Sequence, residues 1–197
     1  MSSRDKIVAE IRKNAPETAP LPEIISTCRY ADPVEQFITV LQSIGGTIHR
    51  VEREEEARLF LADQAFADRI VVNNVPALGD VTINAYVDAN PAAIERVHTV
   101  ILRGRVGVAE NAAVWVPESA MANRLLPFLC QHLVLVLSEK EMVDTLHEAY
   151  AAIGAGEEGY GVFIAGPSKT ADIEQSLVLG AHGPLSLQVL LVKEGLL

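Results

Sequence analysis

The chain has 197 residues, of which 49% are apolar and 5% aromatic, and its 16 basic and 26 acidic residues give a formal net charge of −10. A chain of this length and apolar content buries a sizeable core, which excludes an intrinsically disordered protein. The acidic balance excludes nucleic acid and an anionic membrane surface as partners, because both require a basic face.

Residues 3–14 have the spacing of an amphipathic helix, with Ile7 and Ile11 on one apolar stripe. Three prolines follow closely and prevent regular structure there. We therefore predict a helical arm and Pro-rich linker over residues 1–30 and a single α/β domain over residues 31–197. A helix of this kind packs either on a neighbouring subunit, which would make the protein a homo-oligomer, or on its own domain.

The domain begins with a helix over residues 33–44, for which Asp32 is the N-cap and two glycines, Gly45 and Gly46, are the stop signal. Apolar runs and turn residues then alternate along the chain. The predicted helices are 54–66, 91–97, 119–129 and 138–153, the last opened by a capping box of Ser138 and Glu141. The predicted strands are 47–51, 69–73, 99–102, 112–116, 132–137, 161–165 and 187–192.

Several of these strands are continuous runs of valine, leucine and isoleucine, as in residues 132–137. Such strands are buried on both faces, which is typical of a parallel sheet covered by helices. The predicted fold is therefore α/β, a three-layer α/β/α sandwich with a mostly parallel sheet. Ligands of such sheets gather at the carboxyl ends of the strands, here the loops after Val72, Leu102, Val116 and Ala165.

The last of these loops contains Gly166, Ser168, Lys169 and Thr170 and is expected to lead into a helix. A glycine allows close approach of a ligand, and a helix N-terminus with hydroxyl groups and an ammonium suits an anion. These four residues and Asp172 are therefore candidate anion-binding residues. The alternative is that Ser168 or Thr170 only caps the helix and Asp172 balances its dipole.

Two residues are candidates for acid–base catalysis. Glu110 lies between apolar runs, as a buried acid near a sheet edge would, although it could equally be a solvated loop residue. His182 lies beside glycine, and the alternative is a turn histidine bonded to the backbone. For Cys130, a buried core thiol is favoured over a nucleophile, and for Trp115, packing is favoured over cofactor stacking.

The two cysteines, Cys28 and Cys130, are far apart in unlike contexts, which favours a reduced, cytoplasmic protein over a disulfide framework. No apolar region follows the first residues as in a signal peptide, and no apolar run approaches the ~20 residues of a membrane span. The cysteines and five histidines have no metal-ligand spacing, so no metal site and no cofactor are expected.

The segment from Ile164 to Pro184, followed by the strand 187–192, resembles the C-terminal signature of the lactate-utilisation protein C family, the LUD domain. Residues 108–116 and the Leu125-Leu-Pro127 segment agree with the family more weakly. The resemblance implies a fold similar to the CoA-transferase and phosphosugar-isomerase group.

It also implies oxidation of L-lactate to pyruvate, with this chain as an accessory or co-catalytic subunit beside two iron–sulfur partner proteins and with no redox cofactor of its own. One departure concerns Glu110: the Thr-Gly-Thr that usually follows the acid is Asn111-Ala112-Ala113 here. The rival hypotheses are a free-standing enzyme or binding protein for a phosphorylated sugar or acyl-CoA-like anion, and a scaffold that senses a small acid. Whether the chain is an enzyme stays open.

Overall fold

The computed structural model describes residues 2–17, 19–20, 28–63, 69–154, 158–170, 178–180 and 182–194. Its helices are α1 (Ser3–Lys13), α2 (Pro33–Ser43), α3 (Glu54–Asp63), α4 (Pro91–Ile94), α5 (Glu118–Met121), α6 (Leu126–Leu129) and α7 (Leu146–Ile153), with 3₁₀ turns η1 (Pro76–Leu78), η2 (Ile83–Tyr86) and η3 (Glu139–Glu141). Its strands are β1 (Thr47–Arg53), β2 (Val71–Asn73), β3 (Thr99–Arg103), β4 (Val106–Val108), β5 (Ala113–Pro117), β6 (His132–Ser138), β7 (Met142–Val143), β8 (Gly161–Ile164), β9 (Lys169–Thr170), β10 (Val178–Leu179) and β11 (Ser186–Glu194).

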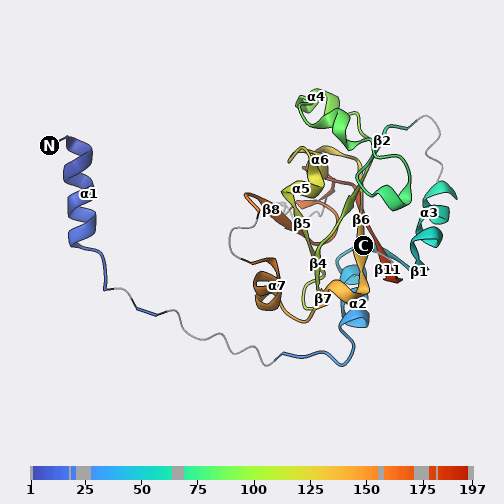
Figure 1. Ribbon diagram of the computed structural model, residues 1–197, viewed down its shortest axis with the longest axis horizontal. Coiled ribbons are helices and arrows are strands. Elements are labelled where there is room, and N and C mark those ends of the chain that lie inside the picture. The colour runs from blue at the N-terminus through green and yellow to red at the C-terminus, as the bar shows by residue number, and fades with distance from the viewer. Residues whose placement is uncertain are drawn as a thin grey trace.

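The central sheet has five strands in the order β1-β11-β6-β3-β2, and every neighbouring pair is parallel (Figure 1). The apolar run of β6 lies in the middle, where Leu135 is in register with Leu102 of β3 and Val189 of β11. Both faces of such a strand are buried, as its continuous apolar sequence predicts. The predicted α/β fold with a mostly parallel sheet and flanking helices is confirmed.

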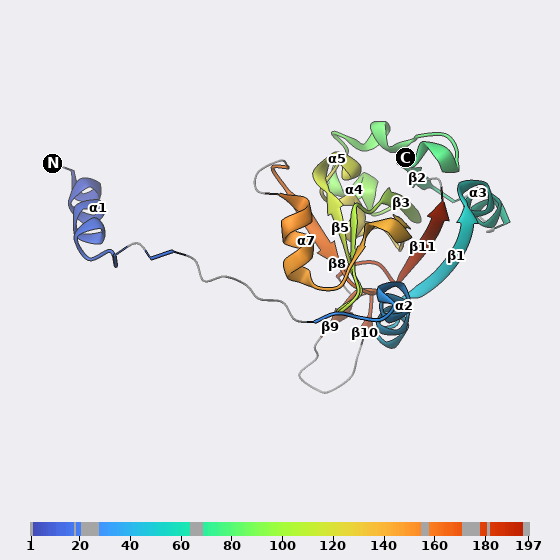
Figure 2. The same ribbon diagram turned by 60° about the horizontal axis from the view of Figure 1, so that its bottom comes forward.

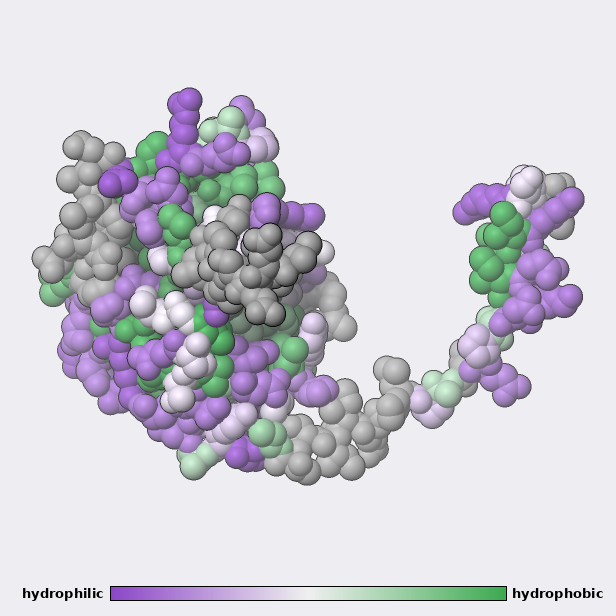
Figure 3. All heavy atoms as spheres, turned by 180° about the vertical axis from the view of Figure 1, so that it is seen from behind, coloured by the Kyte–Doolittle hydropathy of each residue, from purple (hydrophilic) through white to green (hydrophobic). Residues whose placement is uncertain are grey.

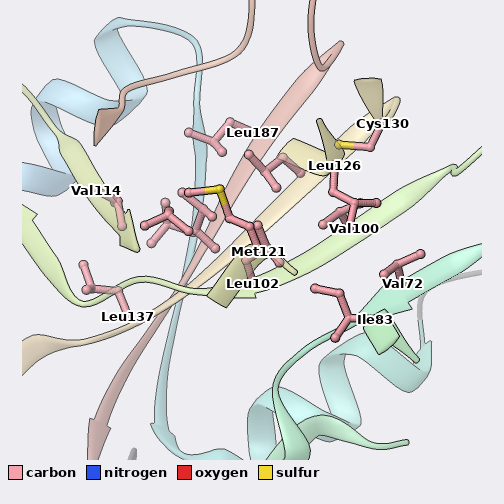
Figure 4. Packing of buried hydrophobic residues seen from close by; sticks show 14 of the residues in the cluster. Val72, Ile83, Val100, Leu102, Val114, Met121, Leu126, Cys130, Leu137 and Leu187 are labelled. Carbon is pink, nitrogen blue, oxygen red and sulfur yellow. The ribbon is translucent and has the colours of Figure 1, made fainter. Parts of the chain in front are cut away.

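A second sheet, in the order β7-β4-β5-β8, was not expected from the sequence. It pairs β5 antiparallel with β4 and β8 and packs beside α2 against one face of the central sheet. Figure 4 shows the core between the two sheets, with Met121 in the middle, Val114 and Leu137 at one end, and Val72 and Ile83 at the other. Burial of this apolar surface is the main stabilising contribution to the fold.

Helices cover the outer faces of both sheets. On the central sheet, Ala57 of α3 and Leu78 of η1 pack against Val134 and other residues of the parallel strands. On the second sheet, Ala149 and Ile153 of α7 pack against β4 and β5. The fold thus has helices on the outside and two sheets in the interior, joined by one large core.

Helix α2 follows the sequence signals closely. Asp32 Oδ1 accepts hydrogen bonds from the backbone N–H groups of Val34 and Glu35, at 3.0 and 3.1 Å. After the helix, Gly45 has a φ of +87°, a conformation that glycine adopts without steric cost. The predicted start and stop of this helix are confirmed.

The predicted helix over residues 119–129 is wrong. The structure has two short helices, α5 and α6, separated by Ala122 with a φ of +55°. Asn123 stabilises the break between the two helices. Its side-chain amide donates to the carbonyl of Tyr86 at 3.1 Å, and its Oδ1 accepts from the N–H of Leu125 at 3.0 Å. The tertiary bond to Tyr86 and the local bond to Leu125 together outweigh the preference for one continuous helix.

The predicted helix over residues 138–153 is also wrong in its first half. The capping box of Ser138 and Glu141 is present, but it closes only the turn η3. The chain then forms β7, which pairs with β4, and α7 begins only after Thr145, whose hydroxyl accepts from the N–H of Glu148. Because β7 pairs with β4, the helix begins several residues later than predicted. Strand β4 has only three residues, too few to be predicted from the sequence.

Helix α1 forms as predicted, and none of its residues is buried. Ile7 and Ile11 are 61% and 64% exposed, and Figure 3 shows apolar side chains along one side of the helix, apart from the rest of the molecule. The division into residues 1–30 and 31–197 stays a prediction. Among the described helices, none has both the length and the apolar character needed to cross a bilayer.

Candidate functional site

A hollow of about 310 Å³ brings together the two ends of the segment that carries the family resemblance. Its lining includes Gly166, Ser168 and Lys169 from one end of this segment and His182 from the other. The remaining lining residues are mostly apolar and come in part from the beginnings of β6 and β11: Pro127, Phe128, Leu133, Phe163, Ile164, Ala165, Pro167, Gly183, Pro184 and Leu187. We call this space the signature hollow.

Backbone hydrogen bonds connect the two ends of the segment 164–184 beside the signature hollow. The N–H of Ser168 donates to the carbonyl of Pro184 at 3.0 Å, and the carbonyl of Ser168 accepts from the N–H of Gly180, also at 3.0 Å. A Cβ added to Gly183 would lie 3.0 Å from the Cβ of Ser168, so glycine permits this close approach. The backbone of Ser168 is therefore already bonded within the protein on both its donor and its acceptor.

Gly166 shapes the bend that leads into the signature hollow. It is buried, its φ is +73°, and an added Cβ would lie 3.2 Å from the carbonyl oxygen of Ile44 at the end of α2. Only glycine combines this φ with so little space at low cost. Figure 2 shows β9 and β10 beside the end of α2, and an added Cβ on Gly45 would lie 4.0 Å from Lys169 Cε.

Lys169 and Thr170 lie in β9, paired antiparallel with Leu179 and Val178 of β10. The expected helix would begin after Thr170, outside the described residues, and stays a prediction. Asp172 lies outside the described residues. Among the described lining residues, the groups that suit an anion include the ammonium of Lys169 and the hydroxyl of Ser168.

Glu110 does not line the signature hollow. It lies at the start of α7, where its Oε1 accepts a hydrogen bond from the backbone N–H of Leu146 at 2.7 Å. A carboxylate is favourable at this end of a helix because the free N–H groups carry partial positive charge. The structure thus separates Glu110 from His182, and a catalytic role for either residue stays a prediction.

The chain departs from the family pattern at Asn111, Ala112 and Ala113, and the backbone there has an unusual conformation. Ala112 is buried and has a φ of +54°, a region in which glycine is favoured over other residues. Asn111 Oδ1 accepts from the N–H of Ala113 at 3.0 Å and so stabilises the turn. The glycine that the family usually has here matches the backbone conformation, which this chain adopts with alanine.

A cluster of charged residues surrounds the same end of α7. Arg29 donates to Asp144 Oδ2 at 2.9 Å and also bonds Glu148, while the N–H of Tyr30 donates to Asp144 Oδ1 at 3.2 Å. The hydrogen bond from Arg29 is the main cause that lowers the pKa of Asp144, and it outweighs the opposite effect of burial. These bonds connect the segment that precedes α2 to α7.

The lowered pKa of Asp144 predicts a contribution to stability that depends on pH. Because the pKa is lower in the folded than in the unfolded chain, this contribution is complete above the ordinary value of about 3.9 and is lost as the pH falls through the folded value. We expect Arg29→Gln to raise the pKa of Asp144, measured from its carboxyl ¹³C shift, and to reduce the loss of stability in acid. Arg12→Gln on α1 is the control, and an unchanged pKa in Arg29→Gln would contradict this assignment.

The remaining candidates are structural. Cys130 is buried, and burial raises the pKa of its thiol to about 12, which confirms the predicted core thiol and disfavours a nucleophile. Trp115 packs on Phe163, with ring centroids 4.8 Å apart, as the packing prediction requires. His98 and His132 lie side by side, with ring centroids 4.6 Å apart, which the sequence spacing did not indicate. Within the described residues, no group of three or more metal-ligating side chains is close enough to hold a metal ion.

A second hollow, of about 390 Å³, lies at the opposite ends of the parallel strands, between the loops that follow β2, β3, β5 and β6. Three of these four loops, those after Val72, Leu102 and Val116, are where the fold class predicts ligands to gather. We call this space the carboxyl-end hollow. The fourth predicted loop, after Ala165, forms the signature hollow instead.

Comparisons with known proteins agree with the resemblance in the sequence. The family model of the LUD domain matches residues 87–192. The lactate utilization protein C of Geobacillus kaustophilus is 30% identical over 125 residues, 60% of this chain and 49% of that protein. The protein of the same name from Deinococcus radiodurans is 25% identical over 200 residues, 98% of this chain and 93% of that protein.

The chain spans about half the length of the Geobacillus kaustophilus relative and 39% of that from Bacillus pumilus. Among solved structures, the crystal structure of a DUF162 family protein from Deinococcus radiodurans is similar, with a TM-score of 0.64 at 19% identity. The match covers 82% of this chain and 97% of that chain, and it supports the α/β fold described above.

Proposed function

This chain belongs to the LUD domain family, and from that membership we propose that it acts in lactate utilisation. The observation that carries the proposal is the relative from Deinococcus radiodurans named lactate utilization protein C, which aligns with 98% of this chain. The shorter but more similar match to the Geobacillus kaustophilus protein of the same name supports it.

Within that role, the chain is an accessory or co-catalytic subunit of an iron–sulfur system that oxidises L-lactate to pyruvate. Support comes from the resemblance and from the cysteines. The chain has only two, fewer than an iron–sulfur cluster takes as ligands, and Cys130 is buried with a raised pKa. Electron transfer would therefore belong to the iron–sulfur partner proteins.

The test is lactate-dependent reduction of an artificial electron acceptor by the two iron–sulfur partners, with and without this chain. We expect the rate to rise when the chain is added and to saturate at a fixed ratio to the partners. Full activity of the partner pair alone would overturn the proposal.

A second candidate function is the binding of a phosphorylated sugar or acyl-CoA-like anion at Gly166, Ser168 and Lys169. The signature hollow favours it, because its lining combines the exposed Lys169 and the hydroxyl of Ser168 with apolar side chains, and about 310 Å³ is at the lower end of ligand-pocket volumes. His182, which also lines the signature hollow, would exchange a proton with such a ligand, and Glu110 would take no part.

The Lys169→Ala variant tests this second function against a matched control, Lys193→Ala. Lys193 is also an exposed lysine, but it pairs with Glu52 at 3.1 Å, away from the signature hollow. We expect Lys169→Ala to weaken the binding of inorganic phosphate about tenfold, as for the loss of one charged hydrogen bond, and Lys193→Ala to leave it unchanged. Equal affinities of the two variants would exclude this site.

A further inference from the structure

Another hollow, of about 550 Å³, adjoins the signature hollow. Its described lining residues are Phe128, Leu129, Cys130, Gln131, Gly180, His182, Gly183 and Leu185. Three of these, Phe128, His182 and Gly183, also line the signature hollow, so the two spaces are neighbours. We call the additional space the flanking hollow. A single ligand that extends past the shared residues would occupy both hollows.

Hydrogen bonds fix the backbone beside the flanking hollow. The N–H of Leu185 donates to the carbonyl of Gln131 at 2.8 Å, and the N–H of Gly180 donates to the carbonyl of Ser168 at 3.0 Å. Gly180 has a φ of +78°, and an added Cβ would overlap with the side chain of Leu185, which therefore packs against the backbone of this glycine. A side chain held in this way loses little conformational entropy when a ligand covers it.

The flanking hollow includes two large apolar side chains that are exposed. Phe128 is 36% exposed and Leu185 is 49% exposed. A single exposed apolar residue is ordinary at a protein surface, but two in one hollow form a surface from which a ligand would displace water. Removal of apolar surface from water is favourable, so these two side chains favour an apolar group as the occupant.

The two hollows differ in charge. The lining of the signature hollow includes the ammonium of Lys169, and no aspartate or glutamate is among its described residues. Among the residues described for the flanking hollow, none is a lysine, arginine, aspartate or glutamate, and its polar side chains are Gln131 and His182. An anionic group thus has a cation in the signature hollow, whereas an uncharged group has apolar contacts in the flanking hollow.

We propose that the two hollows together bind an elongated anion. Its anionic group lies at Lys169 and Ser168 in the signature hollow, and its apolar group lies against Phe128 and Leu185 in the flanking hollow. The inference rests on the second candidate function and narrows it. An apolar lining favours a ligand with an acyl or aryl group over a phosphorylated sugar, whose hydroxyl groups would lose water there. Volumes of about 310 and 550 Å³ are both within the range of ligand pockets.

Calorimetric titration of the whole chain with phenyl phosphate and with glucose 6-phosphate tests the inference. The two probes are phosphate monoesters of equal charge, and they differ in whether the attached ring is apolar or hydroxylated. We expect phenyl phosphate to bind about tenfold more tightly, since its ring is removed from water. Leu185→Ala should reduce this ratio of affinities severalfold, because it shortens an apolar side chain of the flanking hollow.

Two further variants separate the parts of the site. Leu59→Ala is the matched control: Leu59 is a leucine of α3 that is 69% exposed and lines neither hollow, so the ratio should not change. Lys169→Ala should weaken the binding of both probes by a similar factor, because both have the same anionic group. The ratio of affinities therefore reports the flanking hollow, and the affinity for phosphate reports the signature hollow.

A second measurement follows the backbone amide signals of Gln131 and Leu185 by NMR in the unmodified chain. Phenyl phosphate should shift these signals more than inorganic phosphate does. Equal affinities of the two monoesters, tighter binding of glucose 6-phosphate, a ratio that Leu185→Ala leaves unchanged, or unshifted amides would each overturn the inference and leave the second candidate function standing. Inorganic phosphate that does not bind, or that binds the Lys169→Ala variant equally well, would overturn that function and the inference with it.

Discussion

We expect Leu135→Ala to lower the free energy of unfolding by about 2–5 kcal/mol, the usual cost of emptying a leucine-sized space in a core. Leu135 is fully buried, at 0% exposure, in the middle of β6. Its neighbours in register, Leu102 and Val189, belong to strands fixed by hydrogen bonds on both sides, so they cannot move far to fill the gap. The loss should therefore include both transfer and cavity contributions.

Urea denaturation followed by circular dichroism measures this effect, with an unchanged dependence on denaturant as the sign that only stability has changed. Ile7→Ala is the matched control, because it also shortens a large apolar side chain but at a position that is 61% exposed. It should change stability by less than about 0.5 kcal/mol. Similar losses in the two variants would contradict the described core.

The second large effect is expected at Gly161, where Gly161→Ala should cost about 1–3 kcal/mol by overpacking. An added Cβ would lie within 3 Å of three ring atoms of Trp115, including Cε2 at 2.8 Å. The ring also packs on Phe163, which limits how far it can move. The alanine variant must therefore move either the indole or strand β8, which pairs with β5 in this region.

Intrinsic fluorescence reports this movement directly, because Trp115 is the only tryptophan of the chain. We expect a shifted emission maximum in the folded Gly161→Ala variant together with a lower unfolding midpoint. Gly159→Ala is the control, since the one contact of an added Cβ there with the described part of the chain would be a carboxylate oxygen of Glu118, at 3.6 Å. Unshifted emission together with an unchanged unfolding midpoint in the Gly161 variant would show that the indole does not lie over this glycine.

The parts of the fold that could be predicted are those with local causes. Apolar runs such as 132–137 form the buried parallel strands, and the cap Asp32 starts α2 where expected. The wrong helices over residues 119–129 and 138–153 have non-local causes: the bonds of Asn123 to residues near α4, and the pairing of β7 with β4. Propensity along the chain contains no information on such partners.

The candidate site also could be predicted only in part, because its residues come together through contacts between distant segments. Resemblance identified the segment that contains Gly166, Lys169 and His182, but their meeting in one hollow depends on the bond between Ser168 and Pro184, which no spacing indicates. Glu110 was a reasonable candidate by its apolar surroundings, yet its carboxylate bonds the start of α7.

The position of β11 in the central sheet affects how the protein folds during its synthesis. Residues 186–194 form the strand between β1 and β6, so β1 (residues 47–53) lacks this partner in the central sheet until residues 186–194 have left the ribosome. Until then, the nascent chain exposes one uncovered edge of β6 and the apolar side chains of β1. Sheets closed by such distant segments form slowly and aggregate easily on the way, so this protein should depend on a chaperone during synthesis more than its size suggests.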